Sequence, residues 1–172
     1  LARHQARSSH LSGIAMTNND ILRRIRYALD LNDDRMMAIF AQADAVVSRA
    51  EVSDWLKREE DPAAKPCSDV VLATFLNGLI NDRRGKKDGP QPVPEQDLSN
   101  NMIFTKLKIA LNLRADAVLE ILELANFRLS RHELSALFRK PSHKHFRQCH
   151  DQVLRNFLHG VQLKYRPNAP AE

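Results

Sequence analysis

Apolar residues recur at helical spacing in four successive stripes, and the same four stripes return in the second half of the chain. Residues 18–84 and 100–166 align at a constant offset of 82 positions without a gap, and 21 of the 67 aligned pairs are identical. Where the copies differ at a stripe position, the substitution keeps an apolar side chain, as the buried face of a helix requires. The pattern predicts an internal duplication with four helices in each copy.

Polar residues mark the expected starts of these helices. Ser48 with Glu51, and Ser130 with Glu133, have the spacing of a capping box, in which both side chains satisfy free amides of the first turn. These boxes place the start of the third helix in each copy.

Two identical pairs of polar residues fall near other helix starts. Asn19 and Asn101 are expected to cap the first helix of each copy. Asp69 and Asp151 are expected to begin the fourth helix, where a carboxylate interacts favourably with the helix dipole. For all four residues we therefore expect a role at the start of their own helix.

A proline-rich segment separates the copies and favours an extended chain. The expected divisions are a tail or expression remnant, a first repeat, a linker, a second repeat and a second tail, at residues 1–16, 17–84, 85–98, 99–166 and 167–172. Met16 is the expected native start. A repeat of this size buries only a marginal core alone. We therefore expect an all-α protein whose two tandem homologous four-helix units pack about a pseudo-twofold axis.

Composition agrees with a folded helical protein. Of 172 residues, 43% are hydrophobic and 27% charged, and five glycines leave little material for strands joined by tight turns. No apolar run approaches the roughly 18 residues of a membrane span, so no membrane partner is expected. Cys67 and Cys149 occupy equivalent positions, which argues against a disulfide framework and favours a cytoplasmic location.

Charge is where the two copies diverge. Residues 19–84 hold ten Lys or Arg against twelve Asp or Glu, a net charge of −2, whereas residues 101–166 hold twelve against five, a net charge of +7. Five of the seven histidines also lie in the second copy. A field of this sign attracts phosphates or an acidic protein surface. The alternative is a solubilising face without a ligand.

The sharpest contrast lies between the third and fourth helices. Residues 58–66 are acidic, whereas the equivalent residues 140–148 are basic. Phe146 either offers a ring for base stacking or tucks into the core and anchors the loop. The candidate nucleic-acid-binding residues are Arg131, Arg139, Lys140, His143, Lys144, His145, Phe146 and Arg147.

Metal binding and catalysis receive little support. His143, His145, Cys149 and His150 bring four donors close together, but the first copy has the cysteine without the histidines, so we expect no metal site and a buried structural cysteine. No phosphate loop, nucleophile elbow or zinc-protease motif occurs. We expect no catalytic residues and no cofactor.

The second and third helices of each copy resemble a helix-turn-helix unit, whose later helix enters the DNA major groove. In the second copy that helix is expected over residues 130–140 and would expose Arg131, His132, Ser135, Arg139 and Lys140. The arrangement is also the commonest one in all-helical proteins, and no glycine marks the turn.

Several stretches carry a family resemblance, among them Tyr27-Ala28-Leu29-Asp30-Leu31 and Leu154-Arg155-Asn156-Phe157-Leu158. Over residues 17–166 the chain resembles the bacterial family of uncharacterised duplicated proteins typified by YehS. The segment before Met16 and a short Pro-Ala tail depart from that pattern. The resemblance supports the duplication and implies no mechanism.

The leading functional hypothesis is a non-enzymatic bacterial protein whose basic second repeat binds DNA or RNA. The alternative is a protein-protein interaction module with an acidic protein partner. An enzyme with a scattered site comes third. The sequence predicts no oligomeric state.

Overall fold

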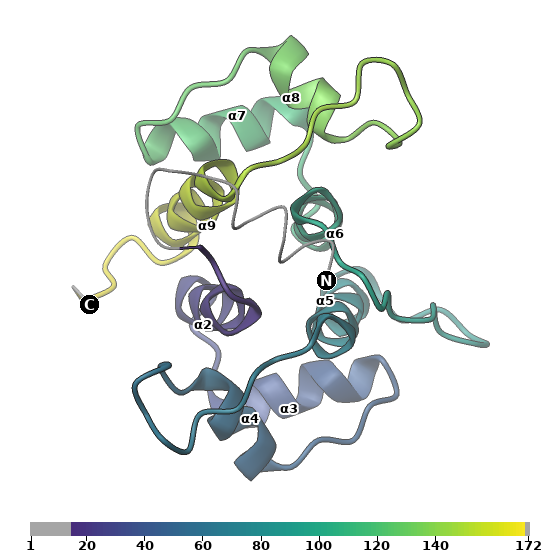
Figure 1. Ribbon diagram of the computed structural model, residues 1–172, viewed down its shortest axis with the longest axis vertical. Helices are drawn as coiled ribbons and strands as arrows, with labels where there is room; N and C mark the ends of the chain where they lie inside the picture. Colours follow the sequence, from purple (N-terminus) through teal and green to yellow (C-terminus); the bar gives the residue numbers. More distant parts are fainter. Residues whose placement is uncertain (1–14, 171–172) are drawn as a thin grey trace.

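A computed structural model describes residues 15–170, which contain eight helices and no strand (Figure 1). The first repeat consists of α2 (Asn18–Ala28), α3 (Asp33–Gln42), α4 (Arg49–Leu56) and α5 (Asp69–Arg84). The second consists of α6 (Asn100–Ala110), α7 (Ala115–Leu124), α8 (Arg131–Leu137) and α9 (Asp151–Tyr165). The all-α prediction with four helices per repeat is confirmed. The tail expected before residue 15 lies outside the described residues.

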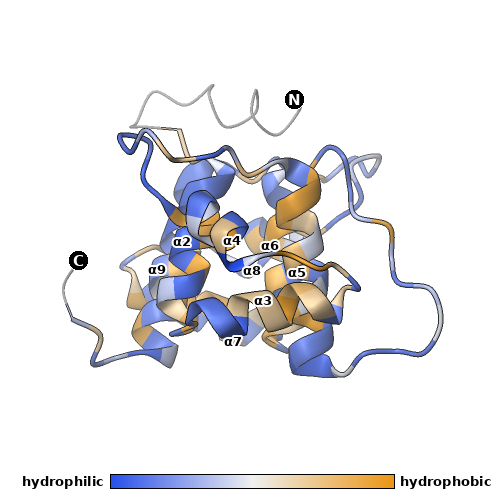
Figure 2. Ribbon diagram, turned by 90° about the horizontal axis from the view of Figure 1, so that it is seen from below, coloured by the Kyte–Doolittle hydropathy of each residue, from blue (hydrophilic) through white to orange (hydrophobic). Residues whose placement is uncertain are grey.

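The two repeats pack through their first and fourth helices. Figure 1 shows α2, α5, α6 and α9 end-on at the centre, with α3 and α4 on one side and α7 and α8 on the other. Helix α2 packs on α9, and α5 packs on α6. The duplication makes α2 equivalent to α6 and α5 equivalent to α9, so these are two copies of one contact. The expected pseudo-twofold arrangement is present, and Figure 2 shows hydrophobic residues gathered on the helix faces turned toward the centre.

A shared phenylalanine anchors each hydrophobic core. Phe75 of α5 packs edge-on against Phe40 of α3, with ring centroids 5.3 Å apart. Its equivalent, Phe157, packs against Phe104 of α6 at 4.7 Å. The second ring therefore comes from α3 in one repeat and from α6 in the other. Exchanging leucine and phenylalanine between two positions conserves core volume, which cores tolerate well.

Two interior glycines allow close approach of helices. A Cβ atom on Gly78 of α5 would lie 2.0 Å from the carbonyl oxygen of Ile39 in α3. A Cβ atom on Gly160 of α9 would lie 2.1 Å from the carbonyl oxygen of Ile121 in α7. Both glycines are required because the neighbouring helix backbone occupies the space of a side chain.

The helix caps agree only in part with expectation. Both capping boxes are present, at Ser48 and at Ser130. The caps of α2 and α6, however, are Thr17 and Ser99. The expectation that Asn19 and Asn101 cap these helices is wrong, since both side chains reach distant backbone instead.

Both expected repeat boundaries fall one residue too late. Met16, assigned to the tail, is 3% exposed, and Leu98, assigned to the linker, is fully buried. Their positions are equivalent under the offset of 82. Each packs into the core just before the first helix of its repeat, so each belongs to the folded unit.

Candidate nucleic-acid interface

The basic residues of the second repeat gather on the connection between α8 and α9. We call residues 139–147 the basic loop. Helix α8 ends at Leu137, three residues before its expected end, so Arg139 and Lys140 belong to this loop rather than to a helix. The exposed members are Lys140, His143, Lys144, His145 and Arg147, while Arg139 and Phe146 are half-buried.

A shared asparagine fixes the ends of this loop. The Nδ2 group of Asn101 donates to the carbonyl oxygen of Leu137 at 3.0 Å and to that of Arg147 at 2.9 Å. Its Oδ1 atom accepts from the amide of Cys149 at 2.9 Å. Asn19 makes the same three kinds of contact in the first repeat. The asparagine therefore shapes the loop in both repeats, and only the loop side chains differ.

The first repeat neutralises two cations that the second leaves without an acid. Lys57 lies 2.5 Å and Lys65 3.9 Å from the carboxylate of Asp54. The equivalent residues in the second repeat are Arg139, Arg147 and Ala136, so alanine replaces the shared acid. Within residues 15–170 no carboxylate pairs with either arginine, nor with Lys140 or Lys144. The charge contrast seen in the sequence becomes a local surface of positive potential.

The ion pair between Lys57 and Asp54 shows which interaction is missing when alanine stands at position 136. The hydrogen bond from Lys57 lowers the pKa of Asp54, and the same bond raises the pKa of Lys57. Both shifts favour the charged forms. With alanine at position 136, the charge of Arg139 remains available to a ligand.

Three imidazole rings surround the middle of the basic loop. The ring centroids of His143 and His145 are 5.5 Å apart, and those of His132 and His145 are 6.5 Å apart. The Nη1 atom of Arg139 lies 3.3 Å from Nε2 of His143. Ring nitrogens add hydrogen-bonding groups beside the cations, as phosphate recognition requires.

No metal centre emerges from these histidines. In the part of the chain that is described, no group of three or more His, Cys, Asp or Glu side chains could hold a metal ion. Cys149 is buried, and its desolvation raises the pKa of the thiol to about 12. Both cysteines are free and buried at equivalent positions, as a structural role requires.

Phe146 is half-buried and lies beside α6. It lines a cavity of about 360 Å³ between α5, α6 and the basic loop, together with Met102, Ile109 and Leu137.

Arg131 has a structural partner. It forms an ion pair with Asp116, and its equivalent Arg49 forms the same pair with Asp34. Because both repeats retain the pair, Arg131 belongs to the architecture and stands apart from the other candidate residues.

The helices of the second repeat give little support to the helix-turn-helix interpretation. Helix α8 has seven residues, which at about 1.5 Å per residue span roughly 10 Å. So short a helix presents few side chains to a major groove. The loop cations are better placed for contacts to a phosphate backbone.

None of the described helices has the length and hydrophobicity needed to cross a lipid bilayer.

Comparisons with known proteins agree with the duplication. Residues 18–85 and 100–166 each match a family described as a protein of unknown function, DUF1456. The chain is 42% identical to the uncharacterized protein YehS of Escherichia coli (strain K12) over 150 residues, covering 87% of this chain and 96% of that relative. No solved structure matches the chain. With both repeats matched, the chain belongs to the DUF1456 family of duplicated helical proteins.

Proposed function

We propose that the protein binds nucleic acid without catalysing a reaction, through contacts between the basic loop and the phosphate backbone. The observation that carries the proposal is that Ala136, close to Arg139 and Arg147, occupies the position that Asp54 has in the first repeat. The same loop framework serves both repeats, but among the described residues Arg139 and Arg147 lack the acid that Asp54 provides to Lys57 and Lys65. We propose a cytoplasmic location, in keeping with two free and buried cysteines.

The type of contact follows from the shape of the site. Exposed cations on a short loop reach phosphate oxygens, which have the same geometry in every sequence. Phe146 lines the cavity beside α6, and α8, which precedes the loop, has only seven residues with which to read bases. We therefore expect binding to be weakly dependent on sequence and strongly dependent on salt.

Charge reversal of the basic loop tests the proposal. The intact chain with Lys140, Lys144 and Arg147 all changed to glutamate should lose binding to mixed-sequence DNA and RNA in a gel shift at low salt. All three side chains are exposed, so the variant should retain its thermal stability.

The first repeat offers a matched control. Changing Ala63, Lys65 and Pro66 of the acidic loop to glutamate adds negative charge at exposed positions, yet should leave binding nearly unchanged. Absence of binding by the unaltered protein at micromolar concentration, or equal loss in both variants, would overturn the proposal.

A protein-protein interaction module is the second candidate. It is favoured by the apolar cavity beside the basic loop, where Met102 and Ile109 are 39% and 45% exposed. An acidic partner with an apolar anchor would suit this surface. Such a complex would persist at high salt, whereas phosphate contacts weaken. Retention of a partner protein by the intact chain at high salt, lost in Ile109→Ser, would support this candidate.

A further inference from the structure

Two side chains of the basic loop meet at a contact that no hydrogen bond between them explains. The Nη1 atom of Arg139 lies 3.3 Å from Nε2 of His143. On its other side, the His143 ring accepts at Nδ1 from the backbone amide of His145, at 3.0 Å. A backbone amide only donates, so this shorter bond assigns the proton of the neutral ring to Nε2. A guanidinium also only donates. Arg139 and His143 therefore present two donors side by side, and neither can accept from the other.

The first repeat contains the same turn with an acid in place of this histidine. Asp61 is equivalent to His143, and its Oδ1 atom accepts from the amide of Ala63 at 2.9 Å, as Nδ1 of His143 accepts from the amide of His145. The backbone bonds of the two turns also correspond, since the amides of Asp61 and His143 each donate to the carbonyl oxygen three residues earlier, at 3.0 and 2.9 Å. The turns share one backbone frame, and their difference lies in the side chain at this position.

That difference changes what acts on the neighbouring cation. In the first repeat the cation is Lys57, the equivalent of Arg139. Its hydrogen bond to Asp54 raises the pKa of Lys57, and the charge of Asp61 acts in the same direction. In the second repeat His143 supplies an N–H group instead of a carboxylate, and the equivalent of Asp54 is alanine. Both acids that act on the cation of the first repeat are therefore replaced beside Arg139.

Carboxylates on the surrounding elements are engaged with other groups. Glu95 lines the cavity that Arg139 borders, but its carboxylate lies 3.1 Å from Nζ of Lys106. Glu133 of α8 accepts from the amide of Ser130 at 2.9 Å. Within residues 15–170, Arg139 forms no ion pair with a carboxylate. The two donors are thus open to an anion from solution.

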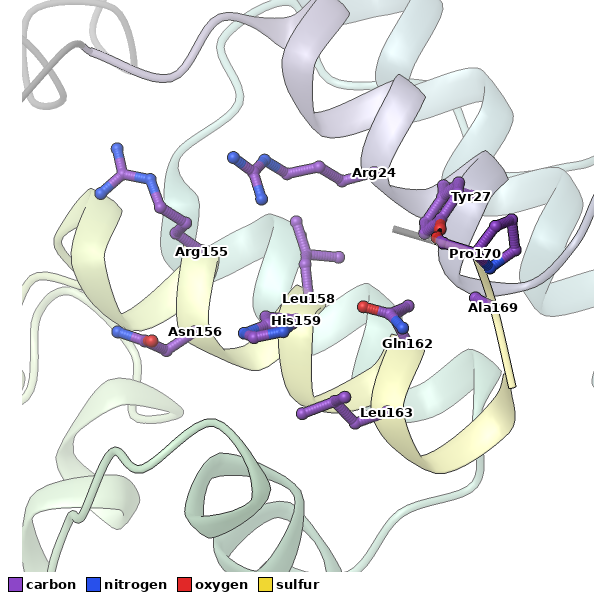
Figure 3. Close-up of a pocket in the computed structure, with 10 residues that line it drawn as sticks. All are labelled: Arg24, Tyr27, Arg155, Asn156, Leu158, His159, Gln162, Leu163, Ala169 and Pro170. Carbon is purple, nitrogen blue, oxygen red and sulfur yellow. Dashed lines mark hydrogen bonds between the residues drawn. The ribbon is translucent and has the colours of Figure 1, made fainter. Parts of the chain in front are cut away.

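Cations also gather on another surface, where acids accompany them. Figure 3 shows Arg24 of α2 and Arg155 of α9 toward one end of a cavity of about 460 Å³. Both arginines line an adjoining cavity of about 530 Å³ together with Asp20, Glu59 and Glu60. Because carboxylates share that surface, it is less favourable to phosphate than the basic loop, and it provides a control position for the experiment below.

A pair of adjacent donors fits the oxygens of one phosphate group. Charge-assisted N–H bonds to oxygen are about 2.7–2.9 Å long, so one phosphate can accept from two nitrogens at the separation seen here. Lys140 and Lys144 of the same loop are exposed and add positive charge nearby. The donor pair fixes the place of the anion, which exposed lysines alone do not.

We propose that Arg139 and His143 form a subsite for a single phosphate group, which accepts from Nη1 of Arg139 and from Nε2 of His143. In naming the nucleic-acid backbone as the natural source of that phosphate, this inference rests on the proposed function. The donor pair itself holds a free phosphate ion by the same chemistry.

Two nearly isosteric substitutions at position 143 test the subsite. His143→Asn keeps an acceptor for the amide of His145 and keeps an N–H donor toward Arg139. His143→Asp keeps the acceptor, removes the donor and installs the residue of the first repeat. The intact chain is titrated with inorganic phosphate while the amide chemical shifts of the basic loop are followed. Binding in the millimolar range is expected for the unaltered protein, with similar affinity in His143→Asn and at least about tenfold weaker binding in His143→Asp.

Controls separate the donor pair from charge alone. Ser142→Asp adds the same charge at the adjacent exposed position and should weaken phosphate binding far less than His143→Asp. Arg24→Ala should leave phosphate binding unchanged. The melting temperature of each variant should match that of the unaltered protein. Equal losses in Ser142→Asp and His143→Asp, a loss in Arg24→Ala, or no shift of the loop amides with phosphate would overturn the subsite.

The tautomer of His143 gives a measurement on the unaltered protein. Long-range proton–nitrogen correlation spectra of the histidine rings should show the proton on Nε2, and this resonance should move when phosphate is added. A proton on Nδ1 would overturn the subsite, because Nε2 would then accept from Arg139.

Gel shifts with mixed-sequence DNA and RNA distinguish this inference from the proposed function. Phosphate binding with the expected order of variants, but without nucleic-acid binding, would support the subsite as one for free phosphate and sink the proposed function. Nucleic-acid binding of equal strength in His143→Asn and His143→Asp, without binding of inorganic phosphate, would sink the subsite and leave the proposed function standing.

Discussion

The backbone amide of Met16 donates a hydrogen bond to Oδ2 of Asp151 at 3.0 Å, joining residues 135 positions apart. The equivalent amide of Leu98 donates to Oδ2 of Asp69 at 3.0 Å. Each carboxylate at the start of a fourth helix therefore holds the chain just before the first helix of the other repeat. These paired bonds join the two repeats where α2 meets α9 and where α5 meets α6.

Asp151→Ala should destabilise the protein more than Asp69→Ala. Asp151 is 4% exposed and also accepts from Nδ2 of Asn100, so its removal leaves two buried donors without an acceptor. We expect a loss of about 2–4 kcal/mol in the free energy of unfolding, and a smaller loss at the half-buried Asp69. Urea denaturation checks this, with the exposed Asp88→Ala as control. Equal stability of Asp151→Ala and Asp88→Ala would be inconsistent with the bond.

Gly160→Ala should be strongly destabilising. Alanine normally favours a helix interior over glycine by about 1 kcal/mol. Here its Cβ atom would meet the Ile121 carbonyl, so α7 and α9 must separate, and we expect a net loss of about 3 kcal/mol. Gly78→Ala should behave alike, whereas Val70→Ala at an exposed position should change little. Thermal denaturation of the three variants measures these changes in stability. A Gly160→Ala variant more stable than the unaltered protein would refute the close contact.

The Cys149 thiol should be inert in the folded protein. Burial, aided by the charge of Asp151, raises its pKa to about 12 from an ordinary value of 9.0. Because the folded state holds this proton more tightly than the unfolded state, the stabilisation is complete below pH 9 and is lost as pH rises toward 12. Iodoacetamide should label Cys149 at pH 8 only after denaturant is added.

The alkaline loss of stability provides a second measurement. In Cys149→Ala, the decline in melting temperature between pH 9 and pH 10.5 should be shallower than in the unaltered protein. Rapid labelling of the native thiol, or the same decline in both proteins, would argue against a buried protonated thiol.

Ala136→Asp should weaken nucleic-acid binding without removing a cation. The substitution installs beneath Arg139 and Arg147 the acid that Asp54 provides in the first repeat. If the new pair contributes about 1 kcal/mol, affinity should fall about fivefold. The reverse change, Asp54→Ala, should not weaken binding. Fluorescence anisotropy with a labelled duplex measures both, and an unaltered affinity in a folded Ala136→Asp protein would count against the role of Ala136.

Local signals in the sequence were sufficient for much of the fold. The apolar stripes and the capping boxes at Ser48 and Ser130 concern contacts along one helix or a repeated pattern. Asn101 and Asp151 were different. Their identity with Asn19 and Asp69 showed that they matter, but their partners lie 36 to 135 residues away. A single sequence does not show which distant backbone groups will adjoin a side chain.

The residues of the candidate site also differ in how far the sequence alone could identify their roles. The basic loop was visible because its residues are contiguous, although the structural role of Arg131 depended on a partner fifteen residues away.

The salt dependence of nucleic-acid affinity tests the central proposal most directly. Association constants for a mixed-sequence duplex should be measured across a range of salt concentrations for the unaltered protein and for the variant with Lys140, Lys144 and Arg147 changed to glutamate. The logarithm of the constant should fall with the logarithm of salt at a slope of about −0.9 for each phosphate contacted, so about −3 for three contacts. The variant should bind too weakly to measure. A flat salt dependence, or equal slopes in the two proteins, would contradict the proposal that the basic loop binds the phosphate backbone.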